Sequence, residues 1–365
     1  MQITSSSHGA FADIISNIKA ITSKTGIGAV ATTLLLMTAP AVAAPKVVAS
    51  IQPVHSLAAS VMEGVGEPGL IVPGNVSPHS HSLRPSQASQ LSGADLIFWV
   101  SPQIETFLIK SLETVSGKAV PLSEVSGITN QPLRDLTKLS AKKEKGDDHD
   151  HESSHGHDDH DDHDKHDDHA KADSHEHDHD HGHDHAEGAN DPHIWLNPKN
   201  AIAMVAAMVK ELTALDPTNG DTYAKNGAAL TDQLTKLDET LSKNFKGNAS
   251  TPYIVFHDAY AHFEGRYGLE PAGVVTLNPE LTPGAASIVR LRKDIVGKKV
   301  GCIYLEPQFS PRSVNALVSG TKIQLGKLDP LGAGLEPGPG LYAQLLQNMG
   351  NAFLNCTTSD DQSKG

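Results

Sequence analysis

VVASIQPVHSLAASVMEGVGEPGLIVPG, residues 47–74, is the stretch that decides the fold. A β-branched run at Val47–Ile51 is followed by a helical pattern over Ser56–Met62 and by a second apolar run at Leu70–Val72. The alternation continues with a helical segment over Gln87–Leu91 and an apolar run over Asp95–Val100. Strands that alternate with helices are typical of βαβ units and parallel sheets. The first half of the chain is therefore predicted to form an α/β lobe.

The C-terminal part of the chain repeats this plan. Apolar runs predict further strands with helical segments between them, and a last helix closes the chain. The strands are expected at Tyr253–Phe256, Gly273–Val275, Val300–Leu305 and Lys322–Leu328, and the last helix at Leu341–Leu354. We therefore expect a second α/β lobe.

Two helices separate these halves. Asn197 and Pro198 form a favourable helix start, an N-cap followed by proline at the first helical position. The next helix is predicted over Asp221–Phe245, where apolar residues recur every three or four positions, and Gly247 ends it. Its ~25 residues would span roughly 37 Å at the α-helical rise, enough to join two lobes and to limit bending.

The predicted fold class is α/β: two α/β lobes with mostly parallel sheets, joined by a long rigid linking helix. A ligand site is expected in the interlobe cleft, because ligands of open α/β sheets bind at the carboxyl ends of the strands. The predicted organisation is a signal peptide over 1–44, an N-terminal lobe over 45–216, a linking helix over 217–247 and a C-terminal lobe over 248–365. Within the N-terminal lobe, a disordered His/Asp-rich loop is expected at 141–190.

The N-terminal segment has the order of a secretory signal peptide. Lys19 and Lys24 precede an apolar stretch, and small residues follow up to Ala43 and Ala44, where cleavage is expected. A retained membrane anchor is the alternative, but the strongly apolar run is shorter than the ~20 residues that span a bilayer. The mature protein is thus expected outside the cytoplasm, without a stable membrane anchor.

Cys302 and Cys356 are the two cysteines of the chain. In an oxidising compartment the simplest assignment is one disulfide between them. A pair of metal-binding thiolates is the competing interpretation, and the apolar neighbours of Cys302 disfavour it.

The charge of the chain is concentrated in one segment. The net charge is −14, and residues 141–190 hold 18 acidic residues against 5 basic ones. This balance disfavours a nucleic-acid partner, which needs a basic surface. The same segment holds 14 of the 21 histidines, a composition that indicates metal binding. The expected auxiliary metal ligands are the alternating histidines His175, His177, His179, His181, His183 and His185.

Three histidines outside this segment lie where strands or turns end. His79 follows the apolar run Leu70–Val72, His193 precedes a helix start, and His257 follows the run Tyr253–Phe256. A site assembled from separate loops needs such positions, because imidazole nitrogens must converge at about 2.0–2.1 Å on one ion. His55 and His262 lack this context and are expected to be structural.

Five ordered motifs resemble those of the ZnuA-type periplasmic zinc-binding proteins, in metal-binding solute-binding protein family 9. They are HSHSLRPS (79–86), DPHIWLNP (191–198), VFHDAYAHF (255–263), LEPQFSP (305–311) and LDPLG (328–332). The resemblance implies two lobes, a rigid linking helix, one Zn²⁺ in the cleft, a periplasmic location and delivery to the membrane permease of a zinc ABC importer. It places the ligands at His79, His193 and His257, and it implies a monomer that is not an enzyme.

The fourth ligand stays open at this stage. Some relatives carry Glu where this chain has Pro78, and many carry Tyr where it has His81. The candidates are water, Asp329, which aligns with a ligand of manganese-binding relatives, and His81. Manganese-binding relatives carry a carboxylate at the position of His257, so a third imidazole favours zinc.

Three other functions remain as alternatives. One is a Mn²⁺ or Fe²⁺ receptor on the same scaffold. A second is a zinc hydrolase, because three histidines and a water also form catalytic sites, with Glu306 as the candidate base. A third is a metal buffer in which only the His/Asp-rich loop binds ions.

Overall fold

The computed structural model describes residues 43–134, 190–247, 251–276, 279–280 and 284–357. The predicted signal peptide therefore lies almost wholly outside the described residues, and so does the His/Asp-rich segment apart from Asn190. None of the described helices is both long and apolar enough to cross a membrane.

Two four-stranded parallel sheets form within the described residues. The first contains β1 (Val47–Ile51), β2 (Gly69–Val72), β3 (Leu96–Trp99) and β4 (Lys118–Pro121), in the order β2-β1-β3-β4. The second contains β5 (Tyr253–His257), β6 (Gly273–Thr276), β7 (Cys302–Leu305) and β8 (Gln324–Lys327), in the order β6-β5-β7-β8. The predicted repetition of one α/β plan is confirmed.

The sheets also share their register. Val47 pairs with Leu96 and Leu96 pairs with Lys118 in the first sheet, while Tyr253 pairs with Cys302 and Cys302 pairs with Gln324 in the second. The numbers of equivalent residues in these strands therefore differ by 206. Each residue at the end of β5, β7 or β8 therefore has an equivalent at the end of β1, β3 or β4.

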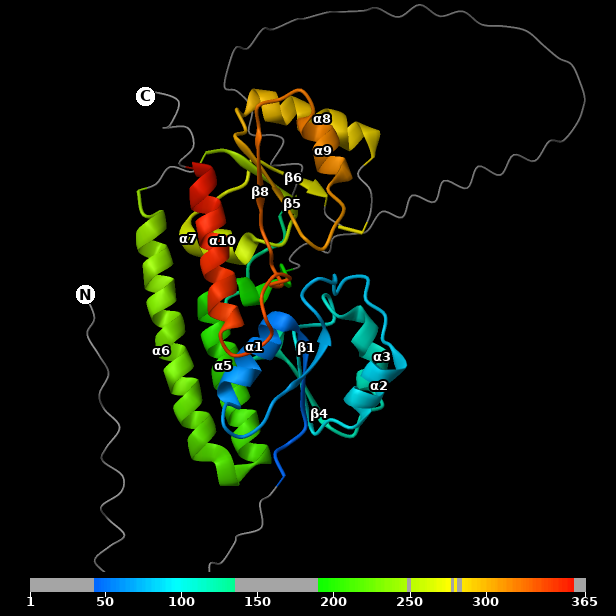
Figure 1. Cartoon of the computed structure of the whole chain (residues 1–365), viewed down its shortest axis with the longest axis vertical. Helices are drawn as coiled ribbons and strands as arrows, with labels where there is room; N and C mark the ends of the chain where they lie inside the picture. The colour runs from blue at the N-terminus through cyan, green and yellow to red at the C-terminus, as the bar shows by residue number, and fades with distance from the viewer. Residues whose placement is uncertain (1–42, 135–189, 248–250, 277–278, 281–283, 358–365) are drawn as a thin grey trace, which may run out of the picture. The chain divides into compact units, whose positions relative to one another are not determined.

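Helices connect and cover the strands (Figure 1). In the first lobe they are α1 (Gln52–Val61), α2 (Pro85–Ser92), α3 (Ile109–Leu112) and α5 (Pro198–Leu215), with short 3₁₀ turns η1 (Thr106–Leu108), η2 (Leu122–Glu124), η3 (Ile194–Leu196) and η4 (Pro217–Asn219). In the second lobe they are α7 (Ala261–Tyr267), α8 (Ala285–Gly297), α9 (Arg312–Val318) and α10 (Leu341–Thr357).

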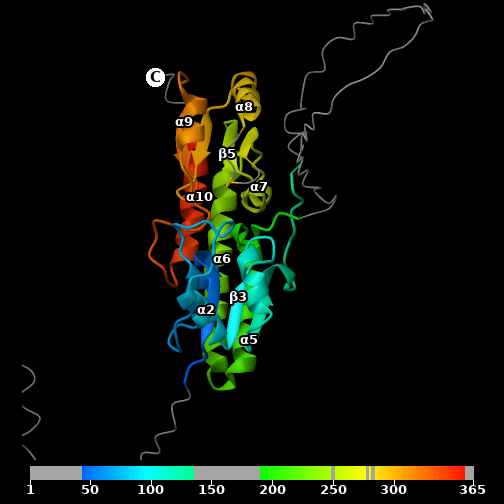
Figure 2. The same cartoon turned by 90° about the vertical axis from the view of Figure 1, so that its right-hand side faces the viewer.

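The long helix α6 (Gly220–Phe245) contacts both lobes. Asn226 donates hydrogen bonds to the carbonyl oxygens of Val61 and Glu63 at the end of α1. Asp238 accepts hydrogen bonds from Arg266 and Tyr267 of α7. In Figures 1 and 2 the helix runs beside α5 and α10, which it contacts along its length. It is therefore held on both lobes rather than at its ends alone.

Local sequence explains the bounds of these helices. The Asn197 side chain accepts a hydrogen bond from the backbone of Lys199 and caps α5. Leu230, Leu234 and Leu241 are buried on one face of α6, as the predicted periodicity requires. α6 ends before Gly247, whose φ of 80° lies in the left-handed region.

Some predicted bounds were wrong. α1 begins at Gln52 and not at Ser56, because Pro53 fits the first turn of a helix and the chain turns directly out of β1. β4 was not predicted, since Val120 is the one buried residue among its four. β8 is shorter than the predicted Lys322–Leu328, and most of its residues are exposed.

One large apolar core includes the first sheet, α5, α6, α10 and one face of the second sheet. A smaller core lies on the opposite face of the second sheet, where Ile254, Phe256 and Ile303 meet Leu291 of α8 and Leu317 of α9. Alternate residues of β5 therefore serve two cores, as the period of a strand requires.

The segment between β8 and α10 packs on α1 of the first lobe. The Gln52 amide donates to the carbonyl oxygens of Gly332 and Leu335, at 3.1 and 3.0 Å. Ser56 donates to the carbonyl oxygen of Gly338 at 2.7 Å. Because these bonds join residues 280 or more positions apart, they hold the two lobes together independently of α6.

Candidate metal centre

His79 lies in the loop that follows β2, at the carboxyl edge of the first sheet. Pro73 and Pro78 prevent this stretch from continuing as a regular strand. The backbone N–H of His79 donates to Ser77 Oγ at 3.3 Å, and the side chain is half-buried. The loop thus carries an imidazole from the first lobe toward the second.

His193 is held by its own local turn. Asp191 Oδ1 accepts one hydrogen bond from the backbone N–H of His193, at 3.0 Å, and another from its Nδ1–H, at 2.6 Å. An Asp side chain that bonds the backbone two residues on is a common turn device. Because Nδ1 carries the donated proton, Nε2 of His193 presents a lone pair.

His257 is the last residue of β5, and Glu306 follows β7. The parallel register pairs Ile254 with Ile303, so residues 257 and 306 are also level. Nδ1–H of His257 donates to Glu306 Oε1 at 2.7 Å. This carboxylate fixes the ring and leaves the Nε2 lone pair facing away from Glu306.

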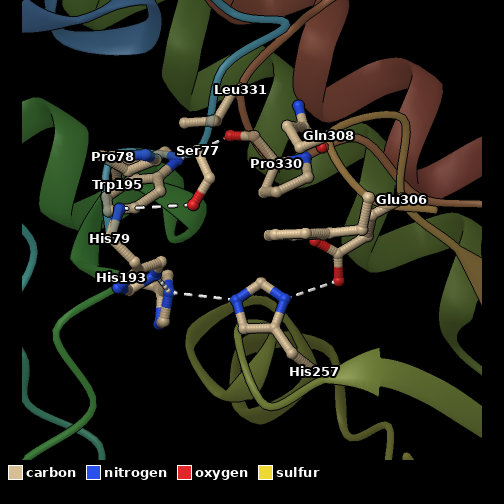
Figure 3. A pocket seen from close by; sticks show the side chains of 11 residues that line it. Ser77, Pro78, His79, His193, Trp195, His257, Glu306, Gln308, Pro330 and Leu331 are labelled. Carbon is tan, nitrogen blue, oxygen red and sulfur yellow. Dashed lines mark hydrogen bonds and ion pairs between the residues drawn. The ribbon is translucent and has the colours of Figure 1, made fainter. Parts of the chain in front are cut away.

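The three imidazoles converge at one point (Figure 3). The Nε2 of His193 lies 3.4 Å from the Nε2 of His79 and 3.4 Å from the Nε2 of His257. All three ligand atoms lie within 4.8 Å of one another. Two nitrogens bound to one zinc ion at tetrahedral angles are also about 3.4 Å apart, given metal–nitrogen distances near 2.05 Å. The lone pairs of His193 and His257 face each other at a distance suited to a shared cation.

The ionisation of these groups agrees with this geometry. Burial, together with His193 and His257, lowers the pKa of His79 to about 2. Burial also places the pKa of His193 well below its ordinary value. Burial alone would lower the pKa of His257, but the carboxylate of Glu306, with smaller contributions from those of Asp258 and Asp191, raises it above its ordinary value. Two of the three rings are thus neutral, which is the form that binds metals.

A small cavity adjoins the cluster. Its walls include the apolar side chains of Trp195, Phe309, Pro330 and Leu331. The cavity measures about 10 Å³, close to the minimum volume that one water molecule occupies. Trp195 packs against His193 with ring centroids 5.3 Å apart, and its Nε1–H donates to the carbonyl oxygen of Pro330 at 2.8 Å. The site is therefore sized for an ion rather than for an organic ligand.

Asp329 and His81, the other candidates among the described residues, are outside the histidine group. Asp329 Oδ1 accepts hydrogen bonds from the Gln308 amide and from the backbone of Leu331 and Gly332. His81 contacts Gln87 and packs on the ring of Phe107, with centroids 4.8 Å apart. The loop histidines His175, His177, His179, His181, His183 and His185 lie outside the described residues.

The two cysteines and two other histidines of the folded part have structural roles. Cys302 and Cys356 form a disulfide, which confirms that assignment over the thiolate alternative. His262 is fully buried in α7 and its Nε2 bonds the carbonyl oxygen of Asp191 at 2.9 Å. His55 bonds the carbonyl oxygen of Pro68 at 2.9 Å. Both histidines are structural, as expected.

Two carboxylates were not predicted to orient imidazoles. Asp191 stands two residues before His193, and Glu306 had been considered only as a base. For Asp191 the signal was local, because an Asp side chain at a turn commonly bonds the backbone two residues on. For Glu306 the signal was the parallel pairing of β5 with β7. Only the register, however, could show that Glu306 is level with His257.

Two parallel α/β lobes with three imidazoles converging between them are typical of a two-lobed binding protein for a divalent metal ion. Comparison with known proteins gives the family. Residues 47–356 match the family described as "Zinc-uptake complex component A periplasmic", and the chain belongs to it.

Curated relatives agree over most of the chain. The chain is 45% identical over 312 residues to the "High-affinity zinc uptake system protein ZnuA" of Brucella abortus (strain 2308), covering 85% of this chain and 91% of the relative. It is 36% identical over 328 residues to the protein of the same name from Yersinia pestis, covering 89% and 95%.

Solved structures support the fold. The chain resembles a structure titled "Crystal structure of ZnuA" with a TM-score of 0.66 and 22% identity, covering 86% of this chain and all of that one (100%). It resembles the periplasmic zinc binding protein TroA from Treponema pallidum with a TM-score of 0.64 and 19% identity, covering 86% and 99%.

Proposed function

We propose that this protein is an extracytoplasmic receptor that captures Zn²⁺ with high affinity and delivers it to the permease of an ABC importer. The observation that carries the proposal is the convergence of the Nε2 atoms of His79, His193 and His257 at zinc-like separations. The relatives named as high-affinity zinc uptake proteins support the same function.

The donor set favours zinc over Mn²⁺ or Fe²⁺. Three imidazole nitrogens suit a tetrahedral ion, whereas Mn²⁺ prefers more oxygen ligands and lies at the weak end of the affinity order for divalent ions. The carboxylates of Asp191 and Glu306 each bond the Nδ1–H of a ligand. These carboxylates thus increase the basicity of the imidazoles without adding oxygen atoms to those that bind the metal.

We propose water as the fourth ligand, in preference to Asp329 or His81. Gln308 lines the cavity beside the histidines, and its Oε1 is buried without a hydrogen-bond partner among the described residues. This oxygen could accept a hydrogen bond from a water on the ion. Asp329 is instead engaged by the Gln308 amide and two backbone N–H groups.

A receptor fits better than a hydrolase. A hydrolytic zinc site needs a positioned base and room for a substrate. Glu306, the candidate base, is bonded to His257, and the cavity has the volume of a single small ligand. We therefore propose that the chain is not an enzyme.

The finer points of location and assembly belong to the same proposal. Residues 1–44 act as a cleaved signal peptide, and the mature monomer works in the periplasm. The His/Asp-rich segment around His175–His185 assists zinc capture or sensing. The membrane partner is the permease of the zinc uptake complex, which the description of the family supports.

Metal titration with elemental analysis tests the proposal, using mature protein with and without residues 147–187. We expect the deletion to retain one tight zinc site and to lower the total zinc stoichiometry. The triple variant His79→Ala, His193→Ala and His257→Ala, made in the deleted protein, should lose the tight site. Retention of tight zinc binding by the triple variant would refute the assignment.

A further inference from the structure

The three candidate ligands reach the site from separate segments. His79 and His193 belong to the first lobe, whereas His257 ends β5 in the second lobe. A metal site binds tightly when its ligands are already held in place. The contacts that hold the His193 segment against the end of β5 should therefore contribute to metal affinity.

On the first-lobe side, two stretches of chain are paired. Asp191 donates its backbone N–H to the carbonyl oxygen of Gln131 at 2.7 Å, and Pro132 forms an antiparallel bridge with Asn190. Asp191 is the residue whose carboxylate holds His193. The stretch 131–134 is thus fixed directly to the turn that carries this ligand.

Arg134, at the end of that stretch, reaches into the second lobe. Its Nη1–H donates to Asp258 Oδ1 at 2.7 Å, and its Nη2–H donates to Glu264 Oε2. Asp258 directly follows His257 in the chain. Glu264 also accepts a hydrogen bond from Tyr253 at 2.7 Å, so the network contacts β5 at its first residue and just past its last.

These groups are well shielded from water. The side chain of Arg134 is 17% exposed, and those of Asp258 and Glu264 are 6% and 0% exposed. A planar guanidinium donates to two carboxylates from separate nitrogens in a fixed fork, a geometry that the single ammonium nitrogen of a lysine does not reproduce. The bridge therefore constrains both distance and orientation between the two lobes.

We propose that Arg134 is a positioning residue of the metal site, which locks the His193-bearing turn of the first lobe to the His257-bearing end of β5. The inference rests on the proposed zinc function. Arg134 is not itself one of the candidate ligands. The guanidinium instead sets the separation of two imidazoles that must bind one ion.

A purely stabilising ion pair would behave differently. Removing one partner of a buried pair destabilises the fold, whatever its relation to the site. Such a loss would not change the zinc affinity of molecules that remain folded. The zinc dissociation constant and dissociation rate of folded protein, rather than the melting temperature, therefore distinguish the two roles.

The experiment compares Arg134→Gln, Arg134→Lys and Asp258→Asn with Arg266→Gln as the matched control. Arg266 also makes a partly buried double contact with a carboxylate, Asp238, but it joins α7 to α6. Zinc affinity is measured by competition with a chelator, and the dissociation rate by rapid mixing with excess chelator, at a temperature where each protein is folded.

We expect Arg134→Gln to weaken zinc binding by ~10-fold and to speed dissociation, in the range found for residues that orient metal ligands. Arg134→Lys should recover part of this loss, and Arg266→Gln should stay within about two-fold of the parent while losing stability. If Arg134→Gln does not fold, Arg134→Lys and Asp258→Asn carry the comparison. Parental affinity and dissociation rate in the folded Arg134 and Asp258 variants would overturn the inference. Failure of the unmutated protein to bind zinc would instead refute the proposed function.

Discussion

The two sheets share one topology and one register, yet they differ at the carboxyl ends of their central strands. The second sheet ends in His257 and Glu306, which bond each other beside the candidate site. The equivalent residues of the first sheet, 206 positions earlier, are Ile51 and Val100, both fully buried in the apolar core. The same edge of the sheet carries a candidate ligand in one lobe and a side chain of the apolar core in the other.

The first sheet instead has a buried carboxyl group of another kind near this edge. Glu105 Oε1 accepts hydrogen bonds from Ser50 and from the backbone of Val100. The first lobe contributes its two candidate ligands through loops, at His79 and His193. The comparison therefore teaches that a binding site is a small set of side chains placed on a repeated scaffold.

The largest expected effect concerns the disulfide, which the second sheet has and the first lacks at the equivalent Leu96. Replacing both Cys302 and Cys356 with Ser should lower the free energy of unfolding by about 4 kcal/mol on the loop-entropy model. Denaturant unfolding measures this loss. Zinc affinity should stay within about two-fold of the parent, because neither cysteine lies in the histidine group. A large loss of affinity would show that the disulfide also shapes the site.

The next effect concerns pH and belongs to the first sheet. Burial raises the pKa of Glu105 to about 7 from its ordinary 4.5. Between these values the unfolded chain is ionised while the folded chain keeps its proton, so stability falls as the pH rises and levels off above about 7. Across this pH window the free energy of unfolding falls by about 3 kcal/mol.

Glu105→Gln isolates this contribution, because the amide has the same shape and does not titrate. Unfolding free energies measured from pH 4.5 to pH 8 in the presence of a chelator should fall less steeply for the variant, with the difference confined to this window. Parallel curves for the two proteins would contradict the assignment.

A third prediction gives the second sheet the residues of the first. The double variant His257→Ile and Glu306→Val should weaken zinc binding by at least ~100-fold, or about 2.7 kcal/mol, because a ligand and its orienting carboxylate are both lost. Competition titration measures the loss. The fold should persist, since Ile51 and Val100 occupy these positions in the first sheet. An unchanged zinc affinity would show that His257 does not bind the ion.

The smallest effect separates the carboxylate from the ligand it holds. Glu306→Gln keeps the hydrogen-bonding shape but removes the charge, and zinc binding should weaken by ~10-fold. Asp191→Asn should act similarly on His193. The same chelator competition quantifies both, and a tighter zinc complex in either variant would argue against an orienting role.

Much of the fold followed from the sequence because the buried strands are continuous apolar runs. Val47–Ile51 and Tyr253–Phe256 were predicted nearly as they occur. β4 was missed because an edge strand buries few side chains, and Val120 alone gave too little signal. The start of α1 was missed because Gln52 and Pro53 continue directly from a strand.

The three histidines of the candidate site could be picked out from the sequence, but the contacts that hold them in place could not. His79, His193 and His257 each stood at the end of a strand or turn, which is visible in one dimension. The pairing of Arg134 with Asp258 and Glu264 joins residues 124 and 130 positions apart and depends on how the lobes pack. No local pattern around Arg134 contains that information.

Trp195 gives the molecule an intrinsic optical reporter. Its indole ring packs against the imidazole of His193, and its backbone carbonyl accepts a hydrogen bond from Tyr342 of α10. The chain contains two tryptophans, and Trp99 of β3 is not among the residues that line the metal cavity. Zinc has a filled d shell and does not quench indole fluorescence. Its binding should instead shift the emission of Trp195, because the neighbouring imidazole becomes fixed. An open-shell ion such as Cu²⁺ at the same position would quench it, and unlabelled protein could thus signal which metal it has taken up.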